Sequence, residues 1–157
     1  MFFQLPASEG LLPKWLLMVS IISIANSIQS YTTLHYTRRI YTPPSASNPP
    51  SGIPPRTLKT PSLSSPETPS QVTPLSSRTF GTWTLLTSIV RLYAAYNINE
   101  PVMYELAICT YGVAWLHFMS EWWVFGTTKW GTPLAGPVFV STGSLVWMWL
   151  QKDFYVG

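Results

Sequence analysis

The amino-acid sequence predicts an all-α, polytopic membrane protein: a four-helix transmembrane bundle with a disordered first loop rich in Pro, Ser and Thr. Charged residues make up only 10% of the chain, whereas soluble proteins contain about 25%. Hydrophobic residues make up 46%, and eight tryptophans are among them. A length of 157 residues fits one domain. The whole chain, residues 1–157, is therefore expected to form a single membrane domain.

Four apolar segments are long enough to cross a membrane. A hydrocarbon core about 30 Å thick needs roughly 17 to 25 helical residues. The expected spans are residues 15–36, 79–96, 103–125 and 133–150. Continuous apolar runs of this length favour helices, because the strands of a membrane barrel alternate apolar and polar residues over about ten positions. The short link at 97–101 predicts that the second and third helices are antiparallel neighbours.

The connection between the first and second spans, residues 42–74, differs in composition from the rest of the chain. It holds ten of the fifteen prolines, in a background of Ser and Thr with few large apolar residues. Such a segment cannot bury enough apolar surface to offset the entropy lost on ordering. We expect it to be a disordered loop.

Basic residues near the span ends predict the orientation. The side that carries the Pro-rich loop has Arg38, Arg39, Arg56, Lys59, Arg78 and Lys129. The opposite side has only Lys14 and Lys152. Because loops rich in Lys and Arg stay in the cytoplasm, the Pro-rich loop is expected to be cytosolic and both termini lumenal.

Ionisable residues inside spans are costly and are therefore candidates for function. Arg91 lies about 9 Å from the link at 97–101, and Glu105 about 6 Å from its other end, so these two are expected to pair. Glu121 lies about 30 Å from that link, near the other membrane face. Its expected partners are instead Arg78 or the Arg38 and Arg39 pair.

His117 lies one helical turn before Glu121, so the two share a helix face. A metal site would need more ligands, and the second histidine, His35, belongs to another span. Glu121 or Glu105 acting as acid or base, with Arg91 stabilising charge, would describe an enzyme. Structural ion pairs account for the same residues, so we expect no catalytic residue, cofactor or metal.

The first span also carries a polar stripe on one face. The residues of this stripe are Ser23, Asn26, Gln29, Ser30 and Thr33. Because polar side chains avoid lipid and hydrogen-bond across helix contacts, we expect the stripe to be buried against another helix. That helix belongs either to the same chain, to a second copy or to a partner, and Asn26 and Gln29 are candidate contacts.

Several motifs in order along the chain resemble the ergosterol biosynthetic protein 28 family. The matching segments are residues 10–16, 37–39, 77–83, 90–96, 114–125 and 136–137. The resemblance extends over roughly 8–41 and 72–155. It does not include the insert at 42–71, so nothing functional is transferred to the insert.

The resemblance implies a non-enzymatic scaffold in the membrane of the endoplasmic reticulum. Its implied partners are the sterol C-4 methyl oxidase, the C-3 sterol dehydrogenase/decarboxylase and the 3-keto sterol reductase of ergosterol synthesis, together with membrane lipid. Nucleic acid is not expected, because the net charge of +3 is small and scattered. The alternative is a membrane protein that binds or modifies a sterol through Arg91, His117 and Glu121.

Overall fold

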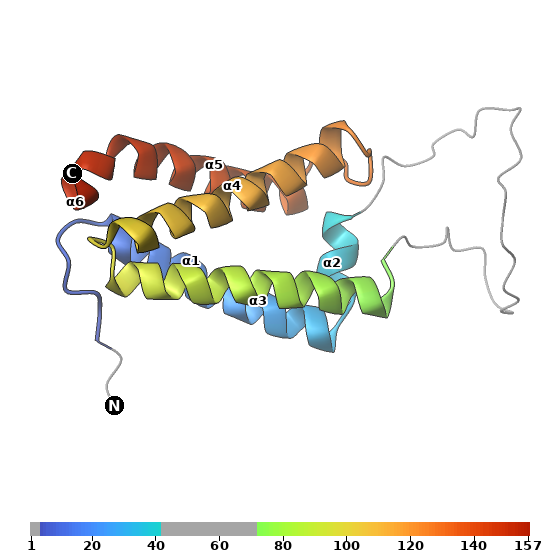
Figure 1. Ribbon diagram of the computed structural model, residues 1–157. Coiled ribbons are helices and arrows are strands. Elements are labelled where there is room, and N and C mark those ends of the chain that lie inside the picture. Colours follow the sequence, from blue (N-terminus) through green and yellow to red (C-terminus); the bar gives the residue numbers. More distant parts are fainter. Residues whose placement is uncertain (1–3, 42–71) are drawn as a thin grey trace, which may run out of the picture.

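The computed structural model describes residues 4–41 and 72–157, which are helical and contain no β-strand (Figure 1). The elements are α1 (Leu12–Thr32), α2 (His35–Ile40), α3 (Pro74–Tyr96), α4 (Pro101–Trp123), α5 (Thr132–Leu150) and α6 (Lys152–Val156). The prediction of an all-α chain is confirmed for these residues. Of the loop expected to be disordered, 42–74, residues 42–71 lie outside the described residues.

Each of the four long helices has a proline in its first turn. These prolines are Pro13, Pro74, Pro101 and Pro133. A first-turn proline has no backbone N–H to leave unpaired, and its φ angle already suits a helix. The helices therefore begin one to five residues before the expected starts at 15, 79, 103 and 133.

The largest of these corrections is at α3, where the expected loop included Pro74. Thr73 is the N-cap of α3, and its hydroxyl accepts a hydrogen bond from the backbone N–H of Ser76. The Ser76 hydroxyl in turn accepts from the backbone N–H of Thr73. This reciprocal capping box fixes the helix start within the Pro-rich composition.

The first expected span, 15–36, is wrong at its C-terminal end, because two helices replace one. α1 stops at Thr32, and Thr33 is extended, with φ −139° and ψ 150°. The Thr32 hydroxyl donates to the carbonyls of Ile28 and Gln29, and the Thr33 hydroxyl also donates to Gln29. Such local bonds compete with helix continuation, and the short α2 then begins a new direction.

The long helices form two antiparallel pairs, α1 with α3 and α4 with α5, and α3 also contacts α4 (Figure 1). The expected antiparallel packing of the second and third spans is therefore confirmed. α2 lies at the end where α3 begins and α4 ends. α6, the C-terminus and the first described residues lie at the opposite end (Figure 1).

Small residues bring α1 and α3 into close contact. Gly81 is buried, and a Cβ atom placed there would lie 3.0 Å from the Tyr31 ring. Ser27 donates to the Gly81 carbonyl at 2.7 Å, and Ser77 donates to the Ser30 carbonyl at 2.8 Å. These hydroxyls hydrogen-bond across the helix contact, as polar residues do between membrane helices.

The polar stripe expected on α1 is only partly buried. Ser30 is buried and Asn26 is half-buried, but Gln29 and Thr33 are exposed. The face that packs against α3 holds Ser27 and Ser30, so it is rotated from the expected stripe. Close backbone approach favours the smallest polar side chains, and the larger amide of Gln29 is left outside the contact.

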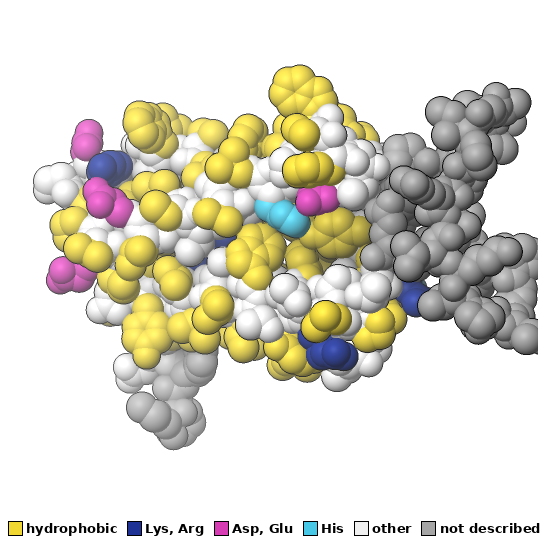
Figure 2. All heavy atoms as spheres, turned by 45° about the vertical axis from the view of Figure 1, so that its right-hand side comes forward, with side chains coloured by type: hydrophobic (Ala, Val, Ile, Leu, Met, Phe, Trp, Pro, Cys, Tyr) yellow, Lys and Arg dark blue, Asp and Glu magenta, His cyan; other side chains and the backbone are white. Residues whose placement is uncertain are grey.

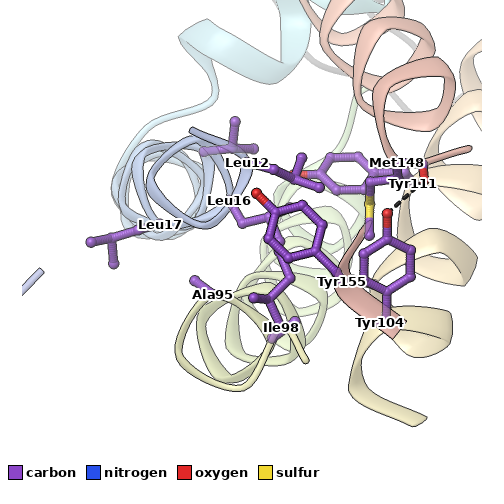
Figure 3. Close-up of a cluster of buried hydrophobic side chains, with 12 residues drawn as sticks. Leu12, Leu16, Leu17, Ala95, Ile98, Tyr104, Tyr111, Met148 and Tyr155 are labelled. Atoms are coloured by element: carbon purple, nitrogen blue, oxygen red, sulfur yellow. Dashed lines mark hydrogen bonds between the residues drawn. The ribbon is translucent and has the colours of Figure 1, made fainter. Parts of the chain in front are cut away.

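The core has two parts, one near each end of the helices. The part beside the termini packs Leu12, Leu16, Tyr104, Tyr111 and Met148 (Figure 3). There the Tyr104 hydroxyl donates to the Met148 carbonyl at 2.5 Å. The part beside α2 comprises Ile40, Phe118, Leu134 and Val138.

Two helices, α4 and α5, are long and apolar enough to cross a membrane by length and composition. Many of their large apolar side chains are exposed, including Leu116, Phe139 and Trp149. Such surface is costly in water and is favoured in lipid. That α1 and α3 also cross the membrane stays a prediction.

Candidate functional site

Two cavities hold three of the four ionisable residues that the sequence placed inside spans, namely Arg91, His117 and Glu121. The first, here called the His117 cavity, has a volume of about 540 Å³. Its lining residues are Thr37, Tyr41, Val72, Ser76, Thr79, Phe80, Trp83, Val113, His117, Glu121 and Thr127. Figure 2 shows a histidine beside an acidic group on a face that is otherwise mostly apolar or neutral.

A hydrogen bond between Tyr41 and His117 organises the His117 cavity. The Tyr41 hydroxyl lies 2.6 Å from His117 Nε2, and the Trp83 ring centroid lies 5.2 Å from the His117 ring centroid. Burial raises the pKa of Tyr41, and the nearby Glu121 carboxylate raises that pKa further. The phenol therefore stays protonated, and the Tyr41–His117 contact is a hydrogen bond that does not need an ionised tyrosine.

Glu121 is held by its own helix end. The Thr127 hydroxyl donates to the Glu121 carboxylate, and the Thr127 backbone N–H donates to the Glu121 carbonyl. The expected ion pair with Arg78 does not form among the described residues, since Arg78 is exposed near the start of α3. The turn after α4, with Gly126 at φ +63°, brings the Thr127 hydroxyl back onto the Glu121 carboxylate.

The second cavity, here called the Arg91 cavity, lies among α1, α3, α4 and α5 and has a volume of about 280 Å³. Arg91 Nε donates to Thr110 Oγ1 at 3.0 Å, and Arg91 Nη2 donates to the Thr110 carbonyl at 3.0 Å. The guanidinium carbon lies 4.0 Å from the centroid of the Tyr111 ring, a cation–π contact. Asn26 also lines this cavity.

The expected Arg91–Glu105 ion pair is wrong. Glu105 instead meets Lys152, with 3.7 Å between Glu105 Oε1 and Lys152 Nζ. Helical side chains lean toward the N-terminus of their own helix. In antiparallel helices this lean carries Arg91 toward the middle of the molecule and Glu105 toward its end, so the side chains diverge although their backbones lie at similar depths.

The remaining predicted site residues lie at one end of the helices. Arg38 and Arg39 of α2 and Arg78 of α3 are exposed there, while Gln29 is exposed near the end of α1. The structure thus brings His117 and Glu121 together in one cavity and Asn26 and Arg91 in the other. No group of three or more His, Cys, Asp or Glu side chains that could hold a metal exists among the described residues.

Sequence reasoning missed four residues that contact the predicted site residues: Tyr41, Thr110, Tyr111 and Thr127. Tyr41 follows a short helix that the sequence did not predict, so no signal placed it beside His117. Thr110 and Tyr111 were within reach of prediction, because the lean of Arg91 places its guanidinium about one turn farther along α4 than Glu105.

Comparison with known proteins supports the resemblance seen in the motifs. Residues 12–146 match the family model described as Erg28 like protein. The chain is 48% identical to ergosterol biosynthetic protein 28 of Candida albicans over 147 residues, which are 94% of this chain and 89% of that protein. It is 41% identical to ergosterol biosynthetic protein 28 of Saccharomyces cerevisiae, over 95% of this chain and 85% of that protein.

More distant relatives extend beyond fungi. The chain is 31% identical to the human ergosterol biosynthetic protein 28 homolog, over 88% of this chain and 83% of that protein. No solved structure matches the chain. The family match, the identities and their coverage agree, and the chain belongs to the Erg28-like family.

Proposed function

We propose that this protein is a non-enzymatic membrane scaffold of ergosterol biosynthesis. Its partners in this proposal are the C-4 methyl oxidase, the C-3 dehydrogenase/decarboxylase and the 3-keto reductase of sterol C-4 demethylation. The relatives' names place them in ergosterol biosynthesis. Holding successive enzymes together would raise the effective concentration of each intermediate at the next active site.

The observation that carries a scaffold role is the separation of the chemically competent side chains. Arg91 lines one cavity, whereas His117 and Glu121 line the other. Thr110, Tyr41 and Thr127 hold these three residues respectively. A general acid or base must reach the same reacting centre as its electrostatic partner, and this arrangement suits structural roles better.

The proposal includes a location and an orientation. The scaffold would be a multi-pass protein of the endoplasmic reticulum, with residues 42–71 in the cytosol and both termini in the lumen. In the described chain, the exposed cations Arg38, Arg39, Arg78 and Lys129 lie at one end, whereas Lys14 and Lys152 at the other end are accompanied by the exposed acids Glu100 and Asp153. Glycosylation acceptor sites are expected to be modified at either terminus, and modification within the loop would contradict the orientation.

Affinity purification in mild detergent, combined with sterol profiling of a deletion strain, tests the function. The scaffold role predicts that the three enzymes co-purify with the tagged protein and that C-4 methylated sterols accumulate in the deletion strain. Trp149→Ala removes a large exposed apolar side chain and controls for nonspecific apolar capture, so it should still co-purify the three enzymes. Absence of all three enzymes together with a normal sterol profile would exclude the proposal.

A second candidate function is sterol binding in the His117 cavity. Its volume falls within the range of about 300–1,000 Å³ typical of small-molecule sites, and its aromatic walls carry a few polar groups. A photoreactive sterol should crosslink saturably to cavity residues such as Thr37, which is buried, and Trp83. Crosslinking confined to exposed lipid-facing residues would leave tethering as the better account.

A further inference from the structure

Arg91 is a buried cation that no carboxylate neutralises within the described chain. Its side chain is only 6% exposed. Among the described acidic residues that the sequence placed within spans, Glu105 pairs with Lys152 and Glu121 lines the other cavity. A buried charge is strongly unfavourable without a counter-charge or full hydrogen bonding.

The guanidinium retains unused hydrogen-bonding capacity. Arginine has five N–H donors, and the hydrogen bonds to Thr110 Oγ1 and the Thr110 carbonyl use two of them. The Tyr111 ring covers one face of the guanidinium plane. The remaining donors have no hydrogen-bond partner among the described residues, and Arg91 lines a cavity of about 280 Å³.

The other polar side chains that line the cavity are all neutral. Ser23 and Asn26 come from α1, Thr84 and Thr87 from α3, and Ser141 from α5. The rest of the lining is apolar or aromatic. The cavity therefore combines one positive charge with a mostly apolar wall, a combination that suits an apolar molecule bearing one negative charge.

The cavity opens at the surface between α1 and α5. Met18 and Ile22, which line it from α1, are 44% and 51% exposed. Gly136 lines it from α5, is exposed, and has no atom within 4 Å of an ideal Cβ position. An apolar ligand would therefore enter sideways between the helices instead of from the charged ends of the molecule.

We propose that the Arg91 cavity binds an apolar carboxylic acid, with its carboxylate on the Arg91 guanidinium. A carboxylate matches the planar guanidinium fork with two parallel hydrogen bonds. Its single negative charge neutralises the single positive charge of Arg91. A phosphate monoester would bring up to two charges, and one of them would remain uncompensated among these neutral side chains.

The inference rests on the proposed function for its place in a reaction sequence. An enzyme that oxidises a methyl group and passes its product to a decarboxylase must release a carboxylic acid. A scaffold that holds both enzymes would meet this acid between the two reactions. The cavity would retain the acid near the decarboxylase, while the apolar remainder of the molecule extends toward lipid through the opening.

Equilibrium binding to the purified full-length protein in detergent tests the site. The probes are a radiolabelled steroid 4-carboxylic acid, its methyl ester, and palmitic acid. We expect the steroid acid to bind at least about tenfold more tightly than its ester, because the ester loses the charge-assisted hydrogen bonds. Equal affinity for acid and ester would overturn the proposal.

Three variants assign the binding to Arg91. Arg91→Met should lower the affinity for the steroid acid about tenfold or more and leave the affinity for the ester unchanged. Arg91→Lys keeps the charge without the planar fork and should bind with intermediate affinity. Lys152→Met, which removes a cation outside the cavity, should bind as the parent does. If Arg91→Met does not fold by circular dichroism, Arg91→Lys decides, and wild-type affinity for the steroid acid in that variant overturns the assignment.

Palmitic acid separates the two sources of a carboxylate. Tighter binding of the steroid acid than of palmitic acid supports the place in the reaction sequence. Tighter binding of palmitic acid supports a carboxylate site but overturns its link to sterol decarboxylation. Co-purification of the three enzymes is measured independently, so loss of the scaffold role and loss of the acid site are distinguishable.

Discussion

The two antiparallel helix pairs pack through different kinds of side chain. α1 and α3 share the more extensive contact, which is built from Ser27, Ser30, Ser77 and Gly81 with hydroxyl-to-carbonyl bonds across it. α4 and α5 meet through larger apolar and aromatic side chains, and both pass the length and composition test for a membrane span. The more polar pair is thus the more closely packed pair.

Because of this difference, the mean hydropathy of α1 and α3 does not describe how apolar their outer faces are. Their serines and glycine lower the mean hydropathy, yet these residues face a neighbouring helix and not the surroundings. Small polar residues let the two backbones approach closely, and their hydroxyl groups find hydrogen-bond partners within the contact. A helix can therefore be less apolar overall and still present an apolar outer face, as exposed Ile21, Ile22 and Leu86 show.

The largest expected effect comes from filling the α1–α3 contact. Gly81→Val places side-chain atoms against the Tyr31 ring at 3.0 Å and Ser30 Cβ at 3.1 Å. Overpacking of this kind should cost about 3 kcal/mol in unfolding free energy, measured by denaturant titration in micelles. Gly143→Val on α5 is the matched control, since nothing lies within 4 Å of its Cβ position. Equal losses for both variants would show that close approach does not distinguish the pairs.

The next effect tests the α4–α5 pair. Met148 lies in the last turn of α5, where carbonyls have no partner within the helix, and the Tyr104 hydroxyl donates to it at 2.5 Å. Tyr104→Phe should lower the unfolding free energy by about 1.5 kcal/mol, because a buried acceptor is left without its donor. Tyr93→Phe, at an exposed position, is expected to be neutral. No difference between the two would contradict a capping role for Tyr104.

A smaller loss is expected from Ser27→Ala. The Gly81 carbonyl that accepts from Ser27 also lies within a helix, so removing the hydroxyl leaves the carbonyl with its backbone partner. Hydrogen bonds between membrane helices average about 0.6 kcal/mol, and we expect a loss near that value. Thermal unfolding beside the exposed control Thr142→Ala measures it. A loss as large as that of Gly81→Val would mean that hydrogen bonding, and not close approach, stabilises the pair.

The smallest effect is expected at the molecule's end. Glu105 and Lys152 lie 3.7 Å apart, with 63% and 47% of their side chains exposed. Ion pairs this exposed contribute about 0–1 kcal/mol before screening by salt, so Glu105→Gln should change stability by less than about 0.5 kcal/mol. The change should shrink further at about 0.5 M salt, because charges are screened more strongly there than at the physiological ionic strength of about 0.15 M. A loss above that of Ser27→Ala would indicate an additional role for Glu105.

The element types could be predicted from sequence, whereas the partners of charged residues could not. Long apolar runs define helices well, and the short link at 97–101 correctly gave antiparallel α3 and α4. Depth counting placed Arg91 and Glu105 at similar levels but ignored side-chain direction, which sends them apart. Tyr41 reaches His117 because the helix breaks at Thr33 and α2 takes a new direction, and no local sequence pattern predicts that direction.

The prolines that begin the four long helices have a consequence for insertion into a bilayer. The first turn of any helix exposes backbone N–H groups that lipid cannot satisfy. A proline there removes one such group and also blocks the helix from growing backward by a further turn. In the proposed four-span topology, each helix would therefore have a fixed upper or lower boundary and could not slide through the bilayer by recruiting loop residues. The depth of Arg91 and of its cavity below the interface would then be set by residues at the helix ends.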